Sequence, residues 1–276
     1  MGLIPFGMLY VFSDFMRFIL YRIIGYRKNV VKDNLKRCFP DLPPSEMEKV
    51  VNLSYKNLTD LIIEGIKGFT ISKKEVYKRY KILNPELLDP FQKKGKSVIL
   101  VLGHYGNWEW GGLSAPVYFH YKEFITFYKP LSNSYIDKYI KKNRSRTGGR
   151  MSPIHKTALT FKQFVDKPSI FVLLADQSPS NAKKSIWVSF LGQQTAFLHG
   201  PEKYATDYDL PVVFVDVQRV KRGYYELKLN ILSENPRNMA PKEITNLYAK
   251  KLEEVILKKP ENWLWSHKRW KLKPIN

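Results

Sequence analysis

The chain has 276 residues, of which 44% are hydrophobic, so it can bury the core of one large domain or of one domain with a helical extension. It carries 46 Lys and Arg against 25 Asp and Glu, a formal net charge of +21. This balance favours an anionic partner: a nucleic acid, an anionic membrane or a phosphorylated substrate. The single cysteine, Cys38, excludes an internal disulfide and most cysteine metal sites, and it fits a reducing compartment.

The first 24 residues are strongly apolar, but Asp14 and Arg17 interrupt them. A bilayer span needs about 20 predominantly apolar residues, and each charge at its centre costs roughly 2.5–3.5 kcal/mol on insertion scales. Asp14, Arg17 and Tyr21 have helical spacing and therefore share one helix face. The segment is predicted to be an amphipathic helix that lies in the membrane interface, with an ordinary core helix as the alternative.

A basic stripe follows the apolar segment. Lys28, Lys32 and Lys36 recur every four residues and lie on one face of a predicted helix. Beside an interfacial helix, such a stripe suits an anionic leaflet, at about 1 kcal/mol per cation near the surface. The alternative is a solvated helix face. A further helix is expected from Pro44 toward Gly65.

The rest of the chain alternates apolar runs with helical patterns, which is typical of an α/β fold: a mostly parallel, mixed sheet covered by helices. The predicted strands are Arg79–Leu83, Ser97–Leu102, Glu123–Tyr128, Ser169–Leu174, Pro211–Val220 and Tyr224–Ile231. The predicted helices are Pro85–Lys93, Asn107–Val117, Asn133–Arg146, Lys156–Asp166, His199–Tyr208 and Pro241–Lys259. A short turn joins the last two strands, which are expected to form an antiparallel hairpin at a sheet edge.

Two regions are therefore predicted. Residues 1–78 form an N-terminal membrane-associating helical region, and residues 79–276 form an α/β body with a C-terminal helix and a basic, aromatic tail. The tail segment Trp263–Lys271 interleaves cations with tryptophans. It is expected to serve either as an anion-binding patch or as packing and interface anchors.

A candidate catalytic motif follows the strand that ends at Leu102. Gly103 permits a tight turn, His104 comes next, and Asn107 is a good N-cap for a helix with Glu109 in its first turn. Ligands of open α/β sheets lie at the carboxyl ends of strands. An imidazole there, with a carboxylate near enough to orient it, suits general-base chemistry. The alternative is a structural histidine beside a capping acid.

Polar residues near the ends of other predicted elements are further candidates. Asp176 and Gln177 follow an apolar strand and are expected either to hydrogen-bond substrate hydroxyls or to brace His104. Arg144 and Arg146 lie near the end of a predicted helix. They are candidates for binding phosphate groups, or else solvated cations that favour the helix dipole.

Nearly the whole chain resembles the late lipid A acyltransferases, bacterial enzymes of the lysophospholipid acyltransferase superfamily. GHYGNWE is similar to their His-x4-acid motif, and further blocks follow in the family's order. These blocks are GYRKNVVKDNL…FP (25–40), GHYGNWE (103–109), YKPLSNSYIDKYIKKNRSRTG (128–148), ADQSP (175–179), FLGQQTAFLHGPEKYA (190–205) and WLWSHKRWK (263–271).

The resemblance implies transfer of a fatty acyl chain from a thioester, acyl-acyl-carrier protein or acyl-CoA, to a hydroxyl of a lipid A precursor. His104 is then the general base and Glu109 its orienting acid. No metal and no other cofactor are expected, and no Gly-x-Ser-x-Gly nucleophile elbow is present. The implied substrate-binding residues are Asn107, Lys129, Arg144, Arg146, Asp176 and Gln177. Lys129 stands where the family more often has Arg, so a point charge replaces a bidentate fork.

The implied partners are the acyl-carrier protein, a glycolipid acceptor and the anionic membrane, at the cytoplasmic face of the bacterial inner membrane. One alternative is the same mechanism on a glycerophospholipid, aminolipid or other glycolipid. A second is a metal hydrolase that uses His104, Glu109, Asp176 and His267, against which no His-Glu-x-x-His motif is present. A third, a nucleic-acid binder, rests on charge alone and has no matching motif, so no nucleic-acid partner is expected.

Overall fold

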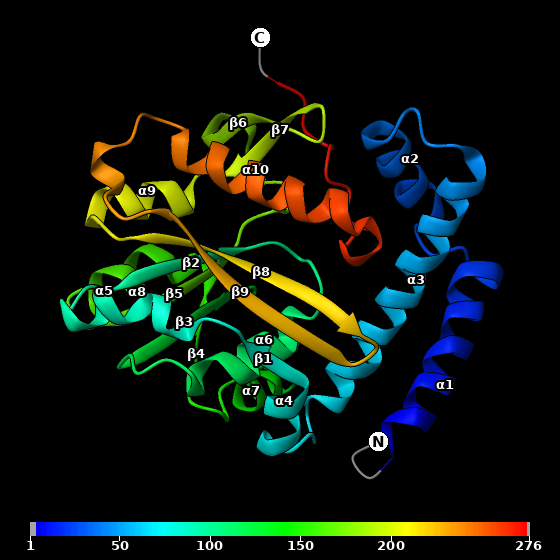
Figure 1. Ribbon diagram of the computed structural model, residues 1–276, viewed down its shortest axis with the longest axis horizontal. Coiled ribbons are helices and arrows are strands. Elements are labelled where there is room, and N and C mark those ends of the chain that lie inside the picture. Colours follow the sequence, from blue (N-terminus) through cyan, green and yellow to red (C-terminus); the bar gives the residue numbers. More distant parts are fainter. Residues whose placement is uncertain (1–3, 275–276) are drawn as a thin grey trace.

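The computed structural model describes residues 4–274. Within them, seven strands form one sheet in the order β1-β9-β8-β2-β5-β3-β4, and two more form a separate hairpin (Figure 1). The sheet strands are β1 (Tyr80–Ile82), β2 (Val98–Leu102), β3 (Glu123–Tyr128), β4 (Arg150–Pro153), β5 (Ser169–Leu174), β8 (Val212–Lys221) and β9 (Tyr224–Ser233). All neighbours are parallel except β8 and β9. The predicted mostly parallel α/β sheet is confirmed.

Helices cover both faces of the sheet (Figure 1). Side chains of a strand alternate between faces. Ile99 and Val101 of β2 therefore join one core, with α8, α9 and α10, while Leu100 and Leu102 join the other, with α4, α5 and α6. The helices are α1 (Phe6–Phe18), α2 (Lys28–Cys38), α3 (Pro44–Lys67), α4 (Lys73–Arg79), α5 (Asp89–Lys93), α6 (Trp108–Ser114), α7 (Ser134–Arg144), α8 (Thr157–Phe164), α9 (Gly200–Tyr208) and α10 (Glu243–Lys258).

The predicted antiparallel hairpin β8–β9 is present, but it does not form the sheet edge. β1 pairs in parallel with β9 and is itself the edge strand. The separate hairpin of β6 (Ser185–Phe190) and β7 (Gln193–Leu198) was not predicted. Its two-residue turn has positive φ angles at Leu191 and Gly192, of 51° and 71°. This is the conformation of a type I′ turn, which fits the twist of hairpin strands.

The apolar N-terminal segment folds as α1, followed by one π-helical turn, η1 (Ile19–Ile23). The helix lies beside α3 in Figure 1, and two of its polar side chains hydrogen-bond residues of α3. Ser13 donates a hydrogen bond to Asp60 at 2.6 Å, and Arg17 donates one to Asn52 at 3.1 Å. Large apolar side chains point outward, among them Val11 (72% exposed) and Phe15 (57% exposed). No helix in residues 4–274 is both long enough and apolar enough to span a bilayer.

Candidate active site

His104 lies at the carboxyl edge of the sheet, two residues beyond β2. Gly103 makes this position possible because a Cβ atom there would lie 2.7 Å from Leu252 Cδ1 and 3.3 Å from Asp176 Oδ2. Asp176 comes from the adjacent parallel strand β5. Leu102 and Leu174 are paired in register, so the residues two positions beyond each of them emerge side by side.

A hydrogen bond joins the two side chains: His104 Nδ1 lies 2.6 Å from Asp176 Oδ1. The His104 backbone N–H and the Trp263 indole N–H each donate to Asp176 Oδ2 at 2.8 Å. Burial alone would raise the pKa of the Asp176 carboxyl, but the electrostatic interaction with His104 and these hydrogen bonds hold it below its usual range. An ionised carboxylate only accepts hydrogen bonds. Nδ1 therefore carries a proton, and Nε2 of the neutral imidazole is the basic nitrogen.

The structure corrects the predicted partner of His104. The carboxylate that hydrogen-bonds the His104 ring belongs to Asp176 and not to Glu109. Asp176 therefore braces His104, which was one of its two predicted roles. Glu109 instead accepts two hydrogen bonds from Arg144, from Nε at 2.9 Å and from Nη2 at 2.5 Å. The helix start explains the difference: the first turn of α6 directs Glu109 toward the end of α7, whereas Asp176 projects from the neighbouring strand.

Asn107 is confirmed as the N-cap of α6, since its Oδ1 accepts the Trp110 backbone N–H at 2.9 Å. Its predicted role in substrate binding stays a prediction, and the structure gives the side chain internal partners. The side chain is fully buried, and its Nδ2 donates to Glu64 Oε2 at 2.6 Å. Both ends of the amide are thus used inside the protein, where they fix the loop that carries His104.

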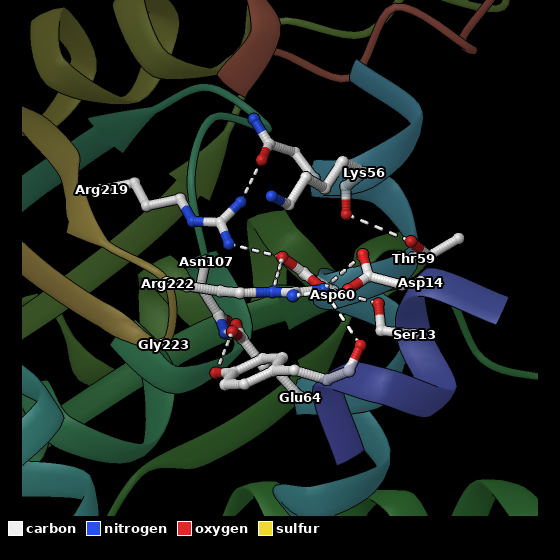
Figure 2. Close-up of polar contacts among 12 residues, drawn as sticks. Ser13, Asp14, Lys56, Thr59, Asp60, Glu64, Asn107, Arg219, Arg222 and Gly223 are labelled. Carbon is white, nitrogen blue, oxygen red and sulfur yellow. Dashed lines mark hydrogen bonds and ion pairs between the residues drawn. The ribbon is translucent and has the colours of Figure 1, made fainter. Parts of the chain in front are cut away.

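Glu64, on α3, is the acceptor that sequence reasoning missed. Its carboxylate also accepts hydrogen bonds from Tyr225 and Tyr10, each at 2.8 Å. Burial raises its pKa, while the hydrogen bonds from the two tyrosines act in the opposite sense. Figure 2 shows Glu64 and Asn107 together with a second buried carboxylate, Asp60. A single carboxylate on an amphipathic helix gives no sequence signal of such a role.

Asp60 connects three elements. It accepts hydrogen bonds from Ser13 of α1 at 2.6 Å, Arg219 of β8 at 2.5 Å, and Arg222 of the β8–β9 turn at 2.6 Å (Figure 2). Arg222 also forms a bidentate pair with Asp14, with both distances 2.9 Å. A buried carboxylate needs such partners because an unpaired buried charge is costly. The network holds α1 against the face of α3 that supports the His104 loop.

Arg146, another predicted substrate-binding residue, also has partners inside the protein. Its Nη2 donates to the backbone oxygens of Gly68 and Ile71, at 3.0 and 2.8 Å. These carbonyls follow the end of α3, so Arg146 closes the segment after that helix.

A cavity of about 490 Å³ opens beside His104, between the sheet and α6. This volume lies within the range of about 300–1,000 Å³ that is typical of ligand pockets. Buried apolar side chains form its deep wall, among them Leu100, Phe119, Phe124, Met151 and Val172. The polar residues at its other end include His104, Glu109, Lys129, Arg144 and Gln177. The structure thus brings the predicted Lys129, Arg144 and Gln177 together with His104 around one cavity.

The aromatic tail supports this site by packing. Trp263 and Trp265 are buried, and Trp263 holds Asp176 as described. His267 Nε2 accepts the Ser178 backbone N–H at 3.0 Å, and burial lowers the pKa of His267 to about 4.

Over the described part of the chain, no cluster of three His, Cys, Asp or Glu side chains is arranged as metal ligands.

A histidine paired with a buried carboxylate thus lies beside a deep apolar cavity at the carboxyl edge of an α/β sheet. Residues 1–272 match the family model of the bacterial lipid A biosynthesis acyltransferases, and the chain belongs to this family. It is therefore an acyltransferase of lipid A biosynthesis, as its resemblance implies.

Two relatives from Escherichia coli K12 share this similarity. The chain is 23% identical to a lipid A biosynthesis palmitoleoyltransferase over 255 residues, which cover 90% of this chain and 80% of the relative. It is 23% identical to a lipid A biosynthesis lauroyltransferase over 279 residues, 98% of this chain and 88% of the relative. A lipid A biosynthesis acyltransferase of Shigella flexneri matches to the same extent as the first.

Proposed function

We propose that the protein transfers a fatty acyl chain from an acyl thioester, carried by acyl-carrier protein or coenzyme A, to a hydroxyl of a lipid A precursor. The observation that carries this proposal is the His104–Asp176 pair at the polar end of the apolar cavity. An apolar cavity of this kind accommodates a single acyl chain, with its thioester near His104. The names of both relatives describe transfer of one such chain.

In the proposed reaction, the acceptor hydroxyl attacks the thioester carbonyl carbon while His104 Nε2 takes its proton. Asp176 stabilises the imidazolium that forms and keeps the ring in its orientation. As the tetrahedral intermediate collapses, the C–S bond breaks and the C–O ester remains. The leaving thiolate takes the proton from His104, so the enzyme returns to its starting state without a covalent intermediate.

We further propose that the protein associates with the cytoplasmic face of the bacterial inner membrane through α1. The outward apolar face of this helix and the net charge of +21 both favour an anionic bilayer surface. Both substrates are amphiphilic or carry apolar chains, so a membrane position brings the acceptor to the site. The acyl-carrier protein is the proposed donor partner.

The test is mass spectrometry of lipid A from cells with and without the gene, together with assays of purified enzyme. We expect lipid A to lose the mass of one acyl chain when the gene is absent. Purified enzyme should acylate a lipid A precursor, and His104→Ala should abolish this activity. Acylation of a glycerophospholipid or aminolipid in place of the lipid A precursor would contradict the proposed acceptor and favour the alternative acceptors.

A further inference from the structure

An acyltransferase must hold two substrates, and the apolar cavity accounts for one of them. A second cavity, a groove of about 620 Å³, lies next to the start of α6, just after the loop that carries His104. Trp108, Glu109 and Gln177 line both spaces. The Trp108 ring packs edge-on against the His104 ring, with 4.9 Å between centroids. The groove and the apolar cavity therefore meet beside the basic histidine.

Two helices supply the apolar walls of the groove. Met16 and Leu20, one helical turn apart, come from α1 and η1. Leu58, Leu61 and Ile62 come from α3, at spacings that place them on one helix face. Ile62 is 37% exposed, so this wall reaches the surface. The deep wall of the cavity described above is instead built from buried side chains.

The outer end of the groove continues onto the exposed face of α1. Phe12 precedes Met16 by four residues, shares its helix face and is 42% exposed. A polar rim is also present. The Arg27 guanidinium lines the groove and donates one hydrogen bond to the Ser266 carbonyl at 2.9 Å. A guanidinium has five N–H donors, so it retains capacity for an anionic group.

We propose that this groove is the acceptor site, and that it holds an acyl chain of the phosphorylated glycolipid between α1–η1 and α3. The chain enters from the membrane-facing side of α1, and the headgroup reaches Arg27 and the junction at Glu109. The donor chain occupies the apolar cavity that His104 lines. A multiply acylated lipid requires a space whose apolar walls reach the surface, as those of the groove do, whereas a single thioester-linked chain fits the cavity whose deep wall consists of buried side chains. This assignment rests on the proposed function.

Substitutions that fill the groove test the assignment. Ile62→Trp and Met16→Trp add bulk from opposite walls, and Leu257→Trp is the matched control. Leu257 lies on α10, is 53% exposed and lines neither cavity. We expect each groove variant to raise the KM for a purified lipid A precursor in detergent micelles about tenfold or more. The KM for acyl-acyl-carrier protein and the choice of acyl chain should stay at wild-type values, and thermal melts verify folding.

Binding without turnover separates this proposal from the proposed function. The Kd of the same precursor is measured with His104→Ala protein, with and without Ile62→Trp. Weaker binding caused by Ile62→Trp supports the groove whatever the rate of the intact enzyme. An unchanged Kd and acceptor KM in both groove variants, or a raised donor KM instead, would overturn it. A wild-type enzyme that binds the precursor and does not acylate it contradicts the proposed function alone.

Discussion

Asp176 holds His104 by two contacts, one to the imidazole Nδ1 at 2.6 Å and one to the backbone N–H at 2.8 Å. A single carboxylate thereby fixes both the ring and the chain segment that carries it. Trp263, from the C-terminal tail, occupies the same carboxylate oxygen as the backbone N–H. The tail is thus part of the active-site support, and the orientation of His104 depends on residues far apart in the sequence.

Gly112 of α6 lines the apolar cavity, and a Cβ atom there would meet nothing within 4 Å. Gly112→Leu should therefore fill cavity volume without strain. We expect product analysis to show a shift toward shorter acyl chains. In an apolar pocket one methylene group is worth roughly 1–3 kcal/mol, which corresponds to a change in selectivity of about tenfold or more. An unchanged chain-length profile would argue against this cavity as the donor-chain site.

The neighbouring glycine gives a contrasting control. A Cβ on Gly111 would lie 2.8 Å from the Tyr80 hydroxyl oxygen. Gly111→Ala should lower stability by forcing the Tyr80 side chain, which also lines the cavity, to shift.

Glu64 accepts hydrogen bonds from Asn107, Tyr225 and Tyr10. Glu64→Leu leaves these donors without their acceptor, and each unsatisfied buried group costs about 1–3 kcal/mol. We expect a loss of about 3 kcal/mol or more in the free energy of unfolding, measured with urea. Glu64→Gln retains an acceptor oxygen and should cost less. Equal losses for the two variants would contradict the hydrogen-bond account.

His267 predicts a pH dependence of stability. Its pKa in the folded protein is about 4, below the ordinary value of 6.5, so the unfolded chain binds a proton first as the pH falls. The contribution of neutral His267 to the stability of the folded protein is complete above pH 6.5 and is lost as the pH drops toward 4. Around it, Asp176 raises its pKa, while Arg269, His104 and Lys271 lower it.

The matched variant is His267→Gln, which keeps an acceptor for the Ser178 N–H and does not titrate. Urea midpoints from pH 7 to pH 4 should fall more steeply for the wild type than for this variant. Parallel slopes would show that His267 is not the responsible group.

The outward face of α1 predicts membrane binding. Phe15 is 57% exposed, so Phe15→Glu should leave folding intact and remove an apolar anchor. Burial of a Phe side chain is worth about 1.5–3 kcal/mol, so flotation with anionic vesicles should show binding weakened about tenfold or more. Leu257→Glu on α10 is the control. Equal flotation of Phe15→Glu and wild type would contradict membrane binding through α1.

Apolar periodicity predicted the main strands, because buried parallel strands such as Ser169–Leu174 consist of uninterrupted apolar runs. It missed the β6–β7 hairpin, in which residues such as Gln193 and Gln194 weaken the pattern. In the site, His104 was found from its place after a strand. The sequence favours nearby Glu109 as its partner, because spacing along the chain predicts contacts between residues close in sequence but not contacts between neighbouring strands. The strand register, which sequence alone does not reveal, selects Asp176.

If Asp176 orients His104 for general-base catalysis, the kcat of Asp176→Asn must fall. Asn keeps the shape but lacks the charge that stabilises the imidazolium. Asp207→Asn, at an exposed ion pair on α9, is the control. We expect Asp176→Asn to lower kcat by about 100-fold or more, with both KM values near those of the wild type and the protein folded. A folded Asp176→Asn enzyme with nearly wild-type kcat would contradict it.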